Sequence, residues 1–201
     1  MVLSPVVTGA TAVENPTFTV DGFRIQTYGC LSDGPIVPSP GAIQTPGVLV
    51  EATHTEPDKN TYLILPGLTG ADPQYNYGSH FLFQGHENGR HDANNVPRGY
   101  ITRVNVDADA AHRVTVLAAT DEDGNYLPAF DGSTWYPFSD VLLFTAELTP
   151  TSGGVWQATP GFPSIVKDMS GIFGRGGYEG IQSDDEGIFG SPRTCRGRKA
   201  P

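Results

Sequence analysis

The chain has 201 residues, enough for one sizeable domain or two small ones, and 38% of them are hydrophobic. Glycine and proline, with 25 and 17 residues, indicate many turns and few long helices, which favours an all-β fold. The net charge of −10 argues against a nucleic-acid partner, because the phosphate backbone would repel it, and no apolar run is long enough for a membrane span.

The first part of the chain, residues 1–60, is polar and rich in Gly and Pro, so we expect an irregular N-terminal segment with an extended loop over residues 33–47. No basic stretch precedes an apolar run at the start, so the sequence as given shows no export signal and leaves the compartment open. The two cysteines, Cys30 and Cys195, do not define a disulfide framework.

From residue 61 onwards, short runs rich in β-branched and aromatic residues predict antiparallel strands. These runs cover residues 61–65, 80–85, 99–107, 112–120, 141–147 and 178–184. Such strands without intervening helices indicate a sandwich or a propeller, and the two valine-rich strands around the polar turn at 107–111 favour the propeller. At roughly 40 to 50 residues per blade, we expect a partial β-propeller over residues 61–187, with two to three blades of a six-bladed parent.

The C-terminal tail, residues 188–201, is abruptly basic in an acidic protein. One hypothesis is that the tail is translated from a shifted reading frame, in which case Cys195 has no function. The alternative is an ordinary basic tail.

The stretch FQGHENGRHD, residues 83–92, comes close to the zinc-protease motif H-E-x-x-H. Its histidines, His86 and His91, are five positions apart and would lie on different sides of a helix. Asn88 and Gly89 form a turn dipeptide. A zinc protease is therefore excluded, and we expect a strand that ends in His86-Glu87, followed by a solvated surface turn from Asn88 to Asp92 that contains His91.

Two acidic turns lie at residues 121–125 (DEDGN) and 184–187 (DDEG). Asp121, Asp123 and Asn125 have the alternate spacing of a calcium loop, but the remaining positions of an EF-hand are absent. Because Asp-Gly is also a common hairpin turn, we expect plain hairpins.

Four segments then occur in a characteristic order: HFLFQGHENG, GYITRVNVD, DGSTWYPFSDVLLFTAE and GRGGYEGIQSDDEG. Over residues 60–187 this order resembles the PhoX-type alkaline phosphatases, which are calcium- and iron-dependent β-propeller phosphoesterases, usually exported. In this resemblance Gly85-His86-Glu87 corresponds to an Asn-His-Glu element of the family. Thr134, Trp135 and Glu147 correspond to a threonine, a tryptophan and a metal-binding glutamate.

The sequence departs from the family at three points, of which one is the stretch from Trp135 to Glu147, longer here than in the family pattern. Gly85 replaces the asparagine, and the family's iron-binding cysteine has no counterpart between Cys30 and Cys195. The resemblance therefore implies calcium as the cofactor and leaves iron without its expected cysteine ligand.

The candidate metal ligands are Glu147, Glu179, Glu87 and His86. Glu147 follows the apolar run VLLF, and a carboxylate at the end of a buried strand must be solvated, paired or metal-bound. Glu179 lies between glycines that allow a close approach of the backbone. The alternatives are a rim residue paired with an arginine for Glu147 and a turn residue for Glu179. The sequence favours structural roles for His86 and Glu87.

The resemblance implies a parent protein that is a metal-dependent phosphoric monoester hydrolase, with a phosphate ester as substrate. We expect this chain alone to be inactive, because ligands from further blades are not part of it. The alternative is a non-catalytic propeller that binds calcium or another small ligand. A lectin-like β-sandwich is the third hypothesis, and it applies if the resemblance is misleading.

Overall fold

A computed structural model of the chain describes residues 6–19, 24–29, 56–87, 98–149 and 151–190. Within these residues the chain forms antiparallel β-sheets and one short helix, α1 (Ser170–Phe173), so the expected all-β class is confirmed. No sheet in the described part of the chain closes on itself.

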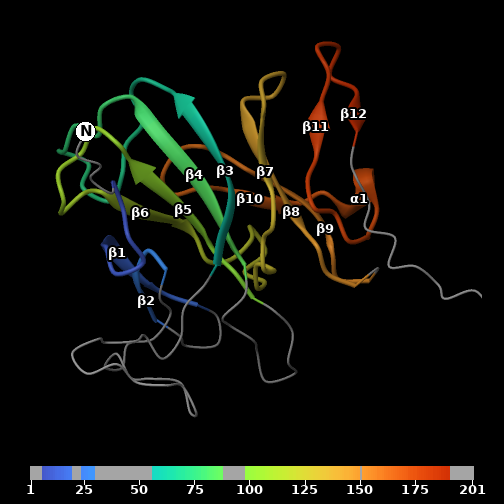
Figure 1. Cartoon of the computed structure of the whole chain (residues 1–201), viewed down its shortest axis with the longest axis horizontal. Coiled ribbons are helices and arrows are strands. Elements are labelled where there is room, and N and C mark those ends of the chain that lie inside the picture. Colours follow the sequence, from blue (N-terminus) through green and yellow to red (C-terminus); the bar gives the residue numbers. More distant parts are fainter. Residues whose placement is uncertain (1–5, 20–23, 30–55, 88–97, 150, 191–201) are drawn as a thin grey trace, which may run out of the picture.

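Two four-stranded sheets form the centre of the molecule (Figure 1). In each sheet every strand pairs antiparallel with the next one along the chain. The first sheet contains β3 (Glu56–Ile64), β4 (His80–Glu87), β5 (Ile101–Asn105) and β6 (Val114–Ala118). The second contains β7 (Ser133–Tyr136), β8 (Val141–Ala146), β9 (Gly154–Ala158) and β10 (Val166–Asp168).

Two hairpins complete the fold: β1 (Ala12–Phe18) with β2 (Arg24–Thr27), and β11 (Gln182–Ser183) with β12 (Phe189–Gly190). The β1–β2 hairpin packs on the first sheet, and the β11–β12 hairpin packs on the second. The first strands of the successive units are neighbours, because β3 contacts β7 and β7 contacts β11. The molecule is thus a series of layers in chain order, with β3, β7 and β11 along one side (Figure 1).

Side chains from both sheets build the largest core, and β8 shows how the sequence achieves this. All six of its residues are buried, and successive side chains point to opposite faces. Leu142 and Phe144 enter the core shared with Phe81 and Phe83 of the first sheet. Val141 and Leu143, on the other face, pack in the core beneath the β11–β12 hairpin.

The expected strands at 61–65, 80–85, 99–107, 112–120 and 141–147 coincide with β3, β4, β5, β6 and β8. Of the expected strand at 178–184, only β11 is present. Four further strands, β7, β9, β10 and β12, were not predicted. The strands β1 and β2 were not predicted either, because they lie within the segment expected to be irregular. Residues 188–190 of the expected tail belong to the β11–β12 hairpin and its turn.

The acidic turn at 184–187 connects β11 and β12 and is the hairpin turn that we expected, whereas the turn at 121–125 closes only an isolated bridge between Thr120 and Tyr126. Asp121 Oδ1 accepts the N–H groups of Asp123 and Asn125, and Asp184 Oδ1 accepts those of Glu186 and Ile188. In each turn the glycine three residues after the aspartate has a positive φ, which L side chains rarely adopt. These two aspartates therefore fix the loops through their own backbone groups.

Several predictions fall outside the described residues: the extended loop at 33–47, Cys30, Cys195, the turn at Asn88 and Gly89, and the loop with His91 and Asp92. The described part of the chain contains no helix with the length and hydropathy of a membrane span.

Candidate metal centre

A β-bulge near the start of β3 positions the first carboxylate of the site. Pro57 pairs with His86 and Asn60 pairs with Gln84, so Asp58 and Lys59 together oppose the single residue Gly85. A bulge of this kind re-aims side chains and is common beside functional sites. Both Asp58 and Lys59 are exposed.

Two side chains from neighbouring strands hold this bulge. Gln84 is buried, and its Nε2 donates to the carbonyl of Asp58 at 2.7 Å. The hydroxyl of Ser133, on β7, donates to the carbonyl of Lys59 at 3.0 Å. The bulge is therefore fixed from both sheets at once.

Glu87 and Asp131 reach the same place because the backbone links β4 directly to the residues before β7. The N–H of Phe130 donates to the carbonyl of His86 at 3.1 Å, which sets Asp131 beside Glu87. The N–H of Asp131 then donates to the carbonyl of Thr145 on β8 at 2.9 Å. Both carboxylate residues are half-buried.

Asp58, Glu87 and Asp131 form what we call the acidic cluster. One carboxylate oxygen from each lies within 4.8 Å of those of the other two. Burial raises the pKa of Asp131 to about 8, with further contributions from a hydrogen bond to Asp58 and from the negative charges of Asp58, Glu87 and Glu147. The cluster therefore holds a proton near neutral pH when nothing else neutralises it.

Glu147 directly follows β8 and is half-buried. Its charge acts on Asp131, so it lies within electrostatic reach of the acidic cluster without being part of the close group of three. Of the four predicted ligands, Glu87 belongs to the cluster and Glu147 lies near it.

His86 lies on the opposite face of β4 from Glu87 and is fully buried. Its Nε2 and the hydroxyl oxygen of Thr102 are 2.8 Å apart, and its ring stacks on Tyr100 at a centroid distance of 4.0 Å. Burial lowers the pKa of His86 to about 3, so the ring is neutral. This environment is that of a structural histidine, and it separates His86 from the cluster.

Glu179 is exposed, and its backbone passes close to the residue that follows Asp131 of the cluster. A Cβ on Gly132, the residue after Asp131, would meet the carbonyl oxygen of Glu179 at 2.6 Å. Glycine at this position therefore allows the chain before β11 to pass beside β7. The Glu179 side chain is not in the described acidic cluster.

Sequence reasoning missed Asp58 and Asp131. Asp58 lies in the segment expected to be irregular, and Asp131-Gly132 has the form of a turn dipeptide. One feature could have drawn attention to Asp131. It lies between Phe130, which is buried, and the strand β7, so its carboxylate must lie at the edge of a core.

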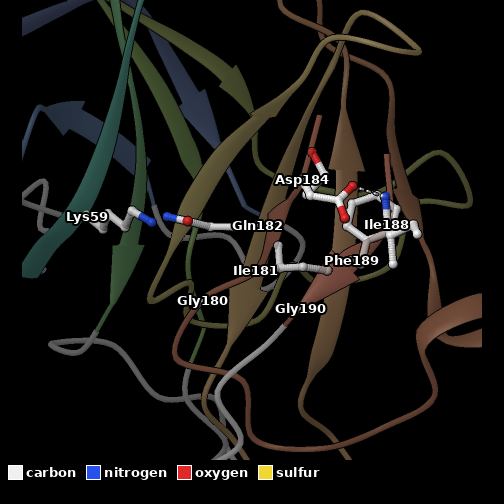
Figure 2. Close-up of a pocket in the computed structure, with 9 residues that line it drawn as sticks. Lys59, Gly180, Ile181, Gln182, Asp184, Ile188, Phe189 and Gly190 are labelled. Carbon is white, nitrogen blue, oxygen red and sulfur yellow. Dashed lines mark hydrogen bonds between the residues drawn. The ribbon is translucent and has the colours of Figure 1, made fainter. Parts of the chain in front are cut away.

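A cavity of about 670 Å³ lies beside the bulge, between Lys59 and the β11–β12 hairpin. Figure 2 shows Lys59 extending across it toward Gln182, with Ile181 and Phe189 on the hairpin side. The cavity thus adjoins the cluster through two consecutive residues of β3, because Lys59 directly follows Asp58.

The chain matches no family model, no curated protein and no solved structure in comparisons with known proteins. The resemblance to the PhoX-type phosphatases therefore stays a prediction from the sequence motifs.

Proposed function

We propose that the acidic cluster binds a divalent cation, with calcium as the preferred ion, in a domain built on the β-propeller plan. The observation that carries this proposal is the convergence of Asp58, Glu87 and Asp131 from three separate segments on one point. The stacking of two four-stranded meanders, with their first strands side by side, supports the propeller plan.

The spacing of the carboxylate oxygens supports calcium. Calcium binds oxygen ligands at about 2.3 to 2.6 Å, so two oxygens on opposite sides of one ion lie up to about 5 Å apart. The three oxygens of the cluster lie within 4.8 Å of one another. Small side-chain rotations therefore suffice to bring all three to a common ion.

The charge of the cluster supports a cation for a second reason. Like-charged carboxylates repel one another, and part of their surface is withdrawn from water, so a bare cluster destabilises the fold. A proton relieves the repulsion only in part, whereas a divalent ion interacts with all three carboxylates. Glu147 adds a further negative charge nearby.

Calcium titration of the purified chain tests this proposal, with isothermal calorimetry and thermal unfolding as readouts. We expect saturating calcium to stabilise the wild-type chain by about 2.7 kcal/mol when its free concentration is 100 times the dissociation constant. Asp131→Asn should weaken calcium binding at least about tenfold, since it removes a charged ligand.

Asp185→Asn is the matched control. It removes the same charge from an exposed residue of the β11–β12 turn and should leave the calcium affinity unchanged. If calcium shifts the unfolding temperature of the two variants equally, the ion does not bind at the acidic cluster.

The second candidate function is hydrolysis of phosphate esters of the PhoX type, and the cavity next to the cluster is the observation that favours it. A bound calcium ion would supply positive charge on one side of an entering phosphate, and the ammonium group of Lys59 would supply it on another. Calcium-dependent hydrolysis of p-nitrophenyl phosphate that Asp131→Asn abolishes would support the enzyme. Calcium binding without hydrolysis would support the non-catalytic alternative.

A further inference from the structure

Each of the two four-stranded sheets has an outer face that a two-stranded hairpin covers only in part. The part that is covered differs between the two sheets. At the first end, β1 contacts β6, the strand of the first sheet that is farthest from β3. The β1–β2 hairpin thus covers the outer half of that face. On the inner strand β3, the alternating side chains of Tyr62 and Ile64 are 52% and 60% exposed.

At the other end the arrangement is reversed. The β11–β12 hairpin contacts β7, the inner strand of the second sheet, whereas α1 contacts β9, the neighbour of the outermost strand β10. Phe189 faces the second sheet, and its neighbour Ile188 is 62% exposed. Within the described residues, this end therefore carries a pair of strands over its inner strand and no second pair beside it (Figure 1).

We propose that two copies of this chain associate head to tail, with the β11–β12 hairpin of one copy packed on the exposed face of β3 in the other. There it would lie beside the β1–β2 hairpin of that second copy. The two half-layers together then match the four-strand width of the central sheets. The contact would continue the packing that already joins the second sheet to the β11–β12 hairpin within one chain.

The distribution of exposed apolar side chains agrees with this contact. Monomers rarely expose several large apolar side chains together unless the surface binds something. Among the eight large hydrophobic residues that the described chain exposes, five belong to the elements at these two ends: Phe18, Tyr62, Ile64, Ile172 and Ile188.

Two such contacts close the assembly. Each copy contributes its two four-stranded sheets and, at each junction, half of a third layer, so two copies form six layers. Closed rings of four to eight such sheets are the normal range for propellers. A head-to-tail contact that closes after two copies gives a two-fold symmetric dimer.

A second copy fits this surface better than an unrelated partner, because the described residues leave the inner strand of the first end uncovered and carry a hairpin over the inner strand of the other end. This inference does not depend on cation binding. Its test is therefore made in EDTA, where failure of the calcium proposal has no influence on the outcome.

Sedimentation of the wild-type chain and three variants between 1 and 100 μM tests the dimer. We expect a monomer–dimer equilibrium whose dissociation constant rises on the order of 100-fold in Ile64→Asp and in Ile188→Asp, because each variant buries a charge in the contact. Ile165→Asp, at a residue that is 52% exposed between β9 and β10, is the control and should dimerise like the wild type. Circular dichroism checks that each variant is folded.

A mixture of Ile64→Asp with Ile188→Asp gives a second, sharper test. A mixed pair retains one intact contact, so we expect partial recovery of the dimer that neither variant shows alone. A wild-type chain that stays monomeric throughout, or a dimer that both variants leave intact, would overturn the proposal. Species that grow without limit as the concentration rises would overturn the closed ring.

Discussion

At the scale of single residues, Asp131 links the acidic cluster to pH. Its pKa is about 8 in the folded chain against an ordinary value of 3.8, so the folded state holds a proton that the unfolded state has released. Stability from this proton is complete below pH 4 and is lost as the pH rises toward 8. His86 acts in the opposite sense. Its pKa is about 3 in the folded chain against an ordinary value of 6.5, so the folded state loses stability only as the pH falls below 6.5.

We therefore predict that the calcium-free wild-type chain loses stability between pH 6.5 and 8, where His86 no longer contributes. Asp131→Asn should remove this decline, since its amide neither titrates nor repels the neighbouring carboxylates. Urea unfolding in EDTA at pH 6.5, 7.2 and 8 measures the effect as a shift of the midpoint. Parallel declines in the wild type and the variant would show that another group titrates in this range.

How far the sequence predicts the site depends on each residue's neighbours in the chain. Glu87 and Glu147 can be found because each follows a strand with a clear apolar pattern. Asp58 owes its place to a bulge, and bulges depend on pairing with a distant strand that no local pattern encodes. The assignment of His86 as a ligand came from the family motif, whereas its surroundings are decided by packing against Thr102 and Tyr100.

At the scale of elements, β4 carries a steric constraint at Gly85. A Cβ at this position would lie 2.6 Å from the Cβ of Phe130. Any larger side chain would push β4 away from the segment that carries Asp131. The glycine is therefore required by the close approach that brings Glu87 and Asp131 together.

Gly85→Ala should lower the free energy of unfolding by about 1 to 3 kcal/mol, as overpacked core positions do. Gly161→Ala is the matched control, because a Cβ there meets nothing within 4 Å and the effect should stay within about 0.5 kcal/mol. Urea unfolding of both variants makes the comparison. Equal effects would mean that the contact between β4 and Phe130 is looser than the structure indicates.

Strand prediction succeeded where a run was long and its composition distinct, as for β4, β5, β6 and β8. It missed β9 because GVWQA begins with glycine and has only Val155 and Trp156 as residues typical of strands, and it missed β7 because a turn dipeptide directly precedes it. All five residues of β5 are buried, including the polar ones. Arg103 is tolerated there because it hydrogen-bonds to Asn105 and lies over the ring of Phe81.

At the scale of the whole molecule, the two central sheets share one core rather than each having its own. Phe81 and Phe83 of the first sheet pack with Leu142, Phe144 and Trp156 of the second. The acidic cluster takes Asp58 and Glu87 from the first sheet and Asp131 from the segment just before β7, so its geometry depends on this common core. Separation of the sheets would therefore disperse the site before either sheet had unfolded.

Phe83→Ala tests this dependence, because Phe83 lies in the first sheet and both tryptophans of the chain, Trp135 and Trp156, lie in the second. Removing the buried ring from the first sheet should cost about 3 to 5 kcal/mol. If the core is common, tryptophan fluorescence and far-ultraviolet circular dichroism should move to the same lower urea midpoint. Ile165→Ala, at an exposed residue, should leave both signals in place. A fluorescence transition that stays at the wild-type midpoint while the dichroism gains an earlier phase would mean that the first sheet unfolds by itself.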